Sequence, residues 1–233
     1  MDIKLYSQEK GKGTPFVLLH GNGENGDYFK NQIDYFSNDY RVIAVDTRGH
    51  GKSPRGTAPF TMNQFVEDLN SFLEDNNINN IILLGFSDGA NIAIKFALKY
   101  QDKIKALILN GADLNTKGVK LNVQIPIEIG YRISRLFQNK SEEAKLKTEI
   151  LGLMVNEPNI KPEELHSIKV PTLVIAGTKD LIKENHSRLI AENIKDSKLS
   201  FIEGNHFIAG NNPSEFNKEV ENFLIKTLKQ KSS

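Results

Sequence analysis

The stretch IILLGFSDGANIAIKFAL, residues 81–98, decides how this chain is expected to fold. It opens with a β-branched apolar run, passes through Gly85-Phe86-Ser87-Asp88-Gly89 and continues with apolar residues at helical spacing. In a G-x-S-x-G turn between a strand and a helix, the glycines allow so sharp a turn that the serine is exposed at the carboxyl edge of a sheet. The stretch therefore predicts a strand, a tight turn that carries Ser87, and a helix. A Gly-rich turn with an N-capping serine is the simpler alternative.

Five further short apolar runs lie on either side of this stretch. Such runs suit strands that are buried on both faces of a parallel sheet. Stretches with helical spacing lie between most of them, which favours an α/β layered domain with right-handed crossovers, that is, a mostly parallel, doubly wound sheet. The runs are residues 16–19, 41–45, 106–109, 172–176 and 199–202.

The interval 112–169 breaks this alternation. It contains no strand-like run that ends in Gly or Asp, and it carries two amphipathic stretches instead, at about 123–137 and about 141–155. Ser141, followed by two acidic residues, is a candidate N-cap for the second stretch. We therefore expect residues 112–169 to form a helical cap insertion, with residues 1–111 and 170–233 as the core of a single domain.

Length and composition limit the class of protein further. The 233 residues, 39% hydrophobic and 25% charged, suffice for one core and a modest insertion, with two full domains unexpected. A net charge of +1 predicts no nucleic-acid partner, and the absence of Cys excludes a thiolate nucleophile. No basic leader and no apolar run of about eighteen residues occurs, so we expect no membrane insertion and a cytoplasmic location.

The glycines after the first apolar run suggest a competing function. Gly21-Asn22-Gly23-Glu24-Asn25-Gly26 is a G-x-G-x-x-G motif, and Asp46 ends the next run, which is the pattern of a dinucleotide site. However, the Tyr6 and Lys10 pair precedes this turn and cannot serve as a dehydrogenase's acid–base pair. A phosphate loop at Gly51-Lys52-Ser53 fails too, because it needs a glycine where Asp46 stands. A nicotinamide oxidoreductase is therefore the lesser alternative.

A serine nucleophile needs a base, and the base needs an acid to orient it. Asp180 follows the run 172–176, and His206 follows the run 199–202. Both would emerge at the same carboxyl edge as Ser87, in the chain order Ser, Asp, His. The simpler alternatives are a helix N-cap for Asp180 and a loop histidine for His206. The remaining histidines have no zinc-binding helical spacing, so we predict no metal.

With these residues in place, the sequence resembles the α/β-hydrolase family. The resemblance lies in five motifs in the family's order, and it covers most of the chain. It implies a sheet of about seven strands, one fewer than usual because only about residues 3–8 precede the first glycine turn, and a cap after the sixth family strand. The motifs are His20-Gly21-Asn22-Gly23, Asp46-Thr47-Arg48-Gly49-His50-Gly51-Lys52-Ser53, Gly85–Gly89, the segment 170–180, and Gly204-Asn205-His206.

The resemblance also implies roles for particular residues. Ser87 would attack an acyl carbonyl, His206 would transfer the proton, and Asp180 would hold the imidazole. The backbone N–H groups of Asn22 and Asp88 would form the oxyanion hole, and no cofactor is expected. We expect the following side chains to line the substrate pocket: Phe86, Phe207, Ile129, Ile133, Phe137 and Met154.

The leading hypothesis is a serine hydrolase that cleaves carboxylic esters of small to medium acyl groups, of the carboxylesterase class EC 3.1.1. The alternatives are other reactions of the same three residues, in a proline-type aminopeptidase, a carbon–carbon bond hydrolase or a perhydrolase, or a hydrolase-like ligand-binding protein with little turnover. An aminopeptidase would need acids in the cap to hold an ammonium group. Candidates are Glu128, Glu142, Glu143, Glu149 and Glu157. The expected partner is a small-molecule ester or related acyl substrate. We expect the protein to be a monomer or a homodimer.

Overall fold

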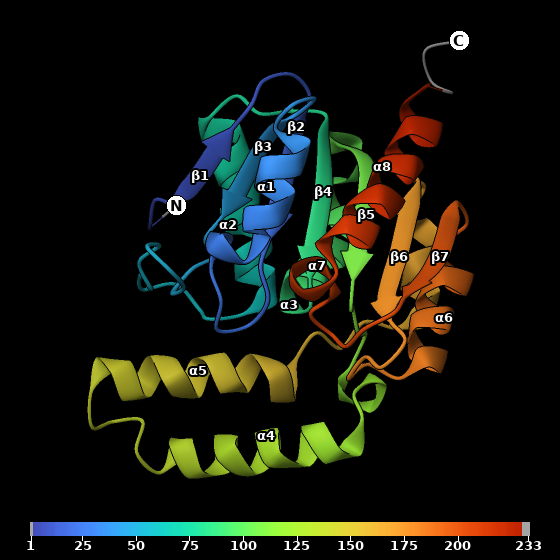
Figure 1. The fold of residues 1–233 in the computed structure, drawn as a ribbon. Helices are drawn as coiled ribbons and strands as arrows, with labels where there is room; N and C mark the ends of the chain where they lie inside the picture. The colour runs from blue at the N-terminus through green and yellow to red at the C-terminus, as the bar shows by residue number, and fades with distance from the viewer. Residues whose placement is uncertain (1, 230–233) are drawn as a thin grey trace.

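A mostly parallel sheet forms the centre of the molecule (Figure 1). The computed structural model describes residues 2–229, and within them seven strands lie in the order β1-β3-β2-β4-β5-β6-β7. Only β1 runs antiparallel to its neighbour, β3, so the carboxyl ends of the other six meet at one edge. The strands are β1 (Ser7–Lys10), β2 (Pro15–Leu19), β3 (Arg41–Val45), β4 (Ile81–Phe86), β5 (Ile104–Asn110), β6 (Thr172–Gly177) and β7 (Ser197–Ile202).

Helices cover both faces of the sheet and explain the continuous apolar runs. Val17 and Leu19 of β2 belong to the core under α2 (Met62–Asp75), α3 (Asp88–Tyr100) and α6 (Glu184–Asn193). Their neighbours Phe16 and Leu18 belong to the core on the opposite face. That face is covered by α1 (Lys30–Phe36) and α8 (Pro213–Lys229), with the short α7 (Ile208–Asn211) between β7 and α8. The predicted doubly wound α/β class with seven strands is confirmed.

The first strand lies later in the chain than predicted. We expected it at about residues 3–8, but β1 covers Ser7–Lys10. Ile3 and Leu5 are buried in the core without joining the sheet, whereas β1 pairs with β3 from Ser7 opposite Val45. The apolar residues Ile3 and Leu5 thus indicate burial in the core and not pairing in a strand.

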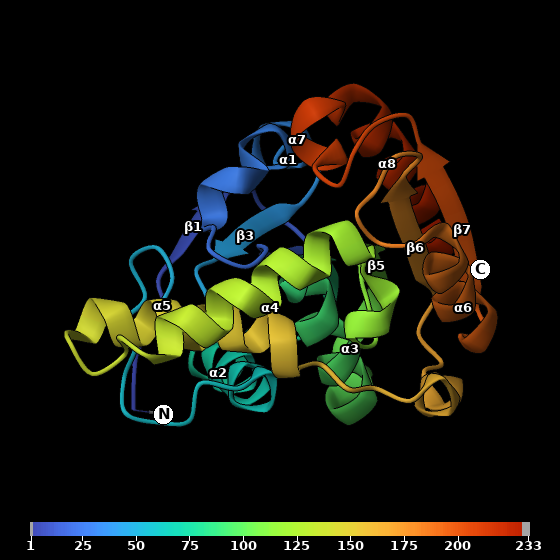
Figure 2. The ribbon, with the colours of Figure 1, turned by 90° about the horizontal axis from the view of Figure 1, so that it is seen from below.

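The interval between β5 and β6 leaves the sheet and holds two antiparallel helices (Figure 1). These are α4 (Leu121–Arg135) and α5 (Glu142–Asn156), which pack against each other across the carboxyl ends of the strands (Figure 2). The Ser141 hydroxyl accepts a hydrogen bond from the Ala144 N–H at 3.1 Å and caps α5. Four 3-10 turns complete the described chain: η1 (Gly26–Phe29), η2 (Gln101–Lys103), η3 (Thr116–Gly118) and η4 (Pro162–Ser167).

Polar contacts attach α5 to the core. Arg55 pairs with Glu149 through two hydrogen bonds of 2.6 and 2.7 Å. The Asn22 side-chain amide donates to the carbonyl of Ile150 at 3.0 Å. The cap is therefore held at a defined place over the sheet edge. Between residues 2 and 229, none of the helices is both long and apolar enough to cross a membrane.

Candidate active site

The turn after β4 holds Ser87 in a conformation that few non-glycine residues adopt. Its φ is +53° and its ψ is −122°. A Cβ on Gly85 would lie 2.2 Å from the Gly89 carbonyl oxygen, and one on Gly89 would lie 2.2 Å from the carbonyl oxygen of Leu19. The two glycines are therefore required for the close approach of β4, α3 and β2, and they permit the sharp turn at Ser87.

Asp180 and His206 come together at the same edge of the sheet. His206 Nδ1 lies 2.6 Å from Asp180 Oδ1, and both side chains are at least 95% buried. The N–H groups of Ile182 and Gly177 donate to the same carboxylate at 2.9 and 3.2 Å. Burial raises the pKa of Asp180, but the hydrogen bond and charge of His206 and these N–H groups together bring that pKa below its usual value. The carboxylate is thus ionised and fixes the imidazole with Nδ1–H toward it.

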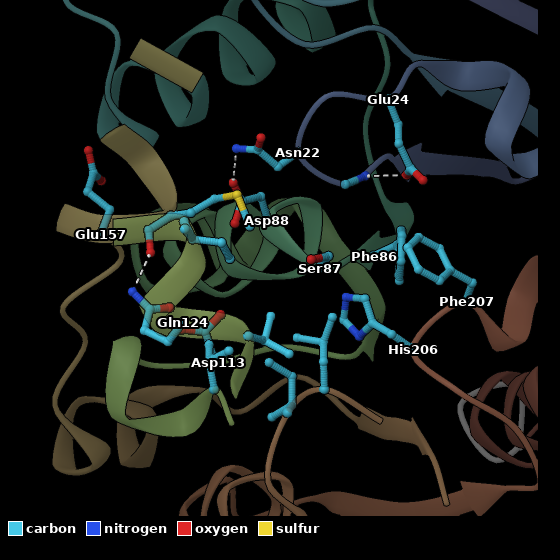
Figure 3. Close-up of a pocket in the computed structure, with 17 residues that line it drawn as sticks. Asn22, Glu24, Phe86, Ser87, Asp88, Asp113, Gln124, Glu157, His206 and Phe207 are labelled. Atoms are coloured by element: carbon cyan, nitrogen blue, oxygen red, sulfur yellow. Dashed lines mark hydrogen bonds between the residues drawn. The ribbon is translucent and has the colours of Figure 1, made fainter. Parts of the chain in front are cut away.

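One cavity brings Ser87 and His206 together (Figure 3). It has a volume of about 130 Å³ and lies between the carboxyl edge of the sheet and the cap. In Figure 3, the His206 ring lies near Ser87, and the rings of Phe86 and Phe207 lie next to the His206 ring. A hydroxyl, an imidazole oriented by a carboxylate, and a space for a reacting group therefore share one site.

The turn after β2 lies next to the start of α3. The Asn22 side chain donates a hydrogen bond to Asp88 Oδ2 at 2.7 Å and so joins the two segments whose N–H groups were predicted to form an oxyanion hole. His20 supports this turn from beneath. It is buried, its Nδ1 lies 2.7 Å from the Gly21 carbonyl oxygen, and its Nε2 accepts from the Thr47 N–H at 3.0 Å. Burial, reinforced by the nearby charge of His50, lowers the pKa of His20 to about 4, so this ring is neutral at pH 7 and holds the turn.

The cavity wall contains only some of the predicted pocket residues. Phe86, Phe207 and Met154 line it. Ile129, Ile133 and Phe137 do not line it, and they are 52%, 53% and 44% exposed. The prediction for these three was wrong, because α4 turns a different face, with Val123, Gln124 and Ile127, toward the cavity.

Several cavity residues were not recognised from the sequence. α4 contributes Gln124, the segment between β5 and α4 contributes Asp113 and Val119, and the loop after β6 contributes Leu181 and Ile182. Asp113 follows a strand of the predicted sheet, a signal that could have identified it. Glu157, one of the predicted cap acids, also reaches the cavity, and its carboxylate accepts from the Met62 N–H.

Asp46 does not occupy the position that a dinucleotide site requires. Its carboxylate accepts hydrogen bonds from the N–H groups of Gly26 and Lys52, both at 2.8 Å. A Cβ on Gly51 would lie 2.1 Å from Asp46 Oδ2, so the loop closes tightly on this side chain. The carboxylate is engaged in holding two turns together, which removes the acid on which the nicotinamide alternative depended. Over the described range 2–229, no group of three or more His, Asp or Glu residues is placed to hold a metal ion.

Known proteins resemble this chain in sequence and in structure. A family model described as alpha/beta hydrolase fold matches residues 14–127. An (E)-2-((N-methylformamido)methylene)succinate hydrolase of Acinetobacter baylyi is 26% identical over 196 aligned positions, which cover 74% of each chain. A proline iminopeptidase of Saccharolobus solfataricus is 29% identical over 256 aligned positions, covering 88% of this chain and 82% of its own.

A solved structure shows the same architecture over nearly the full length. An esterase from Exiguobacterium antarcticum superposes with a TM-score of 0.81 at 23% identity, covering 95% of this chain and 96% of its own. The sheet order, the sharp turn after β4 and the insertion between β5 and β6 agree with these similarities. Together they identify the chain as a protein of the α/β-hydrolase fold.

Proposed function

We propose that this protein is a serine hydrolase that cleaves carboxylic esters of small to medium acyl groups through an acyl-enzyme intermediate. The observation that carries the proposal is the pairing of Asp180 with His206, at 2.6 Å, beside the strained Ser87 in one cavity. Nucleophile, base and orienting acid are the three parts that acyl transfer from a serine requires.

The reaction would proceed in two halves. Ser87 Oγ attacks the ester carbonyl carbon while His206 Nε2 accepts the hydroxyl proton, and Asp180 stabilises the imidazolium through Nδ1–H. The tetrahedral intermediate collapses when the bond to the alcohol oxygen breaks and His206 returns the proton to that oxygen. A water molecule then attacks the acyl-enzyme by the same steps, which releases the acid and restores Ser87.

The oxyanion hole would be formed by the N–H groups of Asn22 and Asp88. The hydrogen bond between their side chains holds the two segments in one arrangement before the substrate binds. In a site of this kind a preorganised donor stabilises the transition state by about 3 to 4 kcal/mol. Asp88 therefore supports the proposal through both its backbone and its side chain.

The size of the cavity supports the expected acyl range. A cavity of about 150 Å³ can hold a benzene ring, and this one has about 130 Å³. A short acyl chain fits such a volume, whereas a long one would extend beyond it. The apolar wall is formed by Phe86, Phe207, Val119, Val123, Ile127 and Met154, together with Leu181 and Ile182.

Hydrolysis of an amide is the second candidate. The relative from Saccharolobus solfataricus is named a proline iminopeptidase, and Glu157 brings a cap acid to the cavity. An aminopeptidase needs such an acid to hold an ammonium group.

A series of p-nitrophenyl esters from acetate to dodecanoate, measured beside a proline arylamide, tests the proposal. We expect kcat/KM to be highest for acyl chains of about two to six carbons and turnover to be lost in Ser87→Ala. The Asp75→Asn variant, which changes an exposed acid at the end of α2, should behave as the wild type. Hydrolysis of the arylamide without hydrolysis of any ester would overturn the esterase assignment.

A further inference from the structure

Carboxyl groups and a side-chain amide line the end of the cavity beneath the cap. Asp88, Asp113 and Glu157 bring carboxyl groups to it, and Gln124 brings an amide (Figure 3). No Lys or Arg is among the described residues that line the cavity, and His206 is their one basic side chain. A neutral, apolar acyl group would gain nothing from these acceptors.

Gln124 is the independent sign that a ligand belongs here. Its side chain is 97% buried, and its Nε2 donates to Glu128 Oε1 at 3.2 Å and to the Met154 carbonyl oxygen at 3.4 Å. Because both partners are acceptors, the amide cannot be turned the other way. Its Oε1 is therefore left without a donor among the described residues, and a buried oxygen in that state costs about 1 to 3 kcal/mol. A bound molecule that carries an N–H or O–H group would satisfy it.

The two aspartates are each satisfied on one oxygen. Asp88 Oδ2 accepts from Asn22, and Asp113 Oδ1 accepts from the Asn91 amide at 2.9 Å. Within residues 2–229 no donor is recorded for the other oxygen of either side chain. Burial, with a smaller contribution from the charge of Asp88, raises the pKa of Asp113 to about 7 against the lowering effect of the Asn91 hydrogen bond, and burial also raises the pKa of Asp88 to about 6. Two neighbouring acids without a cation thus face the same space.

A metal ion does not account for this arrangement, because the described acids include no group placed to coordinate one. A protonated amine does fit. It brings one positive charge and two or three N–H donors, which match two free carboxylate oxygens and one free amide oxygen.

We propose that the end of the cavity formed by Asp88, Asp113 and Gln124 binds a protonated amino group of the substrate, so that the natural substrate is an acyl compound carrying an ammonium group a few bonds from the reacting carbonyl. Only the identity of the reacting carbonyl rests on the proposed function. The ammonium site itself depends on the acceptors and not on Ser87.

Binding to the Ser87→Ala protein tests this without turnover. The probes are the amides of β-alanine, 4-aminobutyrate and 5-aminopentanoate, each compared by titration calorimetry at pH 7.5 with the amide in which a methyl group replaces the ammonium. We expect at least one ammonium compound to bind tenfold or more tightly than its methyl counterpart. Equal binding within all three pairs would overturn the proposal.

Variants in the same Ser87→Ala background locate the site. Asp113→Asn keeps the oxygen that accepts from Asn91 and should reduce the ammonium preference at least fivefold, and Gln124→Leu should reduce it by a smaller factor. Asp75→Asn removes an exposed acid and should leave the preference unchanged. If Asp113→Asn and Asp75→Asn changed the ammonium preference equally, the preference would come from the long-range charge of the protein. That result would contradict the proposed site.

Catalysis by the protein with Ser87 intact separates this proposal from the ester hydrolase assignment. The p-nitrophenyl esters of β-alanine and butyrate differ, like the paired amides, in carrying either an ammonium group or a methyl group at the end of the acyl chain. If butyrate is cleaved and the amide pairs bind equally, the ammonium site is wrong and the hydrolase stands. If the ammonium amides bind selectively and no ester is cleaved, the hydrolase is wrong and the ammonium site stands.

Discussion

Ser87 has a positive φ in the tight turn that joins β4 to α3. Such a conformation costs a non-glycine residue about 1 to 3 kcal/mol. The Ser87 N–H donates to the Asn110 carbonyl at 2.8 Å, and the Ser87 carbonyl accepts from Ala90 at 2.8 Å and from Asn91 at 3.1 Å. These bonds stabilise the strained residue from both β5 and α3. The strain places the hydroxyl at the cavity, where the proposed chemistry needs it.

The raised pKa of Asp113 predicts how the stability of the protein depends on pH. Its folded pKa of about 7 lies above the usual 3.8, so between these values the folded state binds more protons than the unfolded state. The contribution of Asp113 to stability therefore decreases as the pH rises through this window. Asparagine avoids the buried charge. We therefore expect Asp113→Asn to raise the free energy of unfolding at pH 8 by on the order of 2 kcal/mol, and the unfolding temperature by roughly 4 to 8 °C.

Thermal unfolding at pH 4 and pH 8 measures this difference. At pH 4 the aspartate is largely protonated in the folded state, so the two proteins should unfold at similar temperatures. A stabilisation of Asp113→Asn that is the same at both pH values would contradict the assigned pKa.

Single residues were predictable where a strand fixes their position. Asp180 and His206 each follow a strand of the sheet, and the topology brings them to one edge. Gln124 was not predictable, because it belongs to a helix whose orientation over the sheet is set by tertiary contacts. Its place in the cavity depends on α4 packing against α5, which the local sequence pattern does not determine.

At the scale of elements, the contact between α3 and β2 depends on Gly89. A side chain there would meet the backbone oxygens of Leu19 and His20 at 2.2 and 2.5 Å, and backbone cannot move aside as a flexible side chain can. We therefore expect Gly89→Ala to lower the free energy of unfolding by at least about 3 kcal/mol, measured by urea denaturation.

Gly130 in α4 is the matched control. A Cβ there meets nothing within 4 Å, and alanine favours a helix by about 1 kcal/mol over glycine. Gly130→Ala should therefore leave stability unchanged or raise it by up to about 1 kcal/mol. If both alanine variants behaved alike, the close approach of α3 and β2 would not be the reason for Gly89.

The helices and strands were largely predictable from the sequence. Which face of a helix lines the cavity was not. The two helices of the insertion have nearly the predicted bounds, because apolar periodicity and the Ser141 cap are local signals. The apolar stripe with Ile129 and Ile133 was expected to face the substrate, but α4 has apolar residues on more than one side. The face with Val123 and Ile127 is the one that lines the cavity.

The two cap helices form part of the cavity wall, and the Arg55–Glu149 pair helps to hold them there. The pair joins the loop before α2 to the middle of α5, and both side chains are largely buried. We expect Glu149→Gln to weaken this attachment by about 1 to 2 kcal/mol and to speed amide hydrogen exchange in α5 several-fold to about tenfold.

Glu143 in the first turn of α5 provides the comparison. It is exposed, and no ion pair is recorded for it in the described part of the chain. Glu143→Gln should change exchange in α5 much less than Glu149→Gln. Faster exchange in both variants to the same degree would mean that the core contact does not position the cap.

Covalent labelling tests whether Ser87 is a nucleophile activated by His206. An alkyl fluorophosphonate forms a bond from phosphorus to a nucleophilic serine oxygen and releases fluoride. Intact-mass measurement of the wild type should show one adduct per chain, and Ser87→Ala should show none. An unlabelled wild type, or an adduct that persists in Ser87→Ala, would show that Ser87 is not the activated nucleophile.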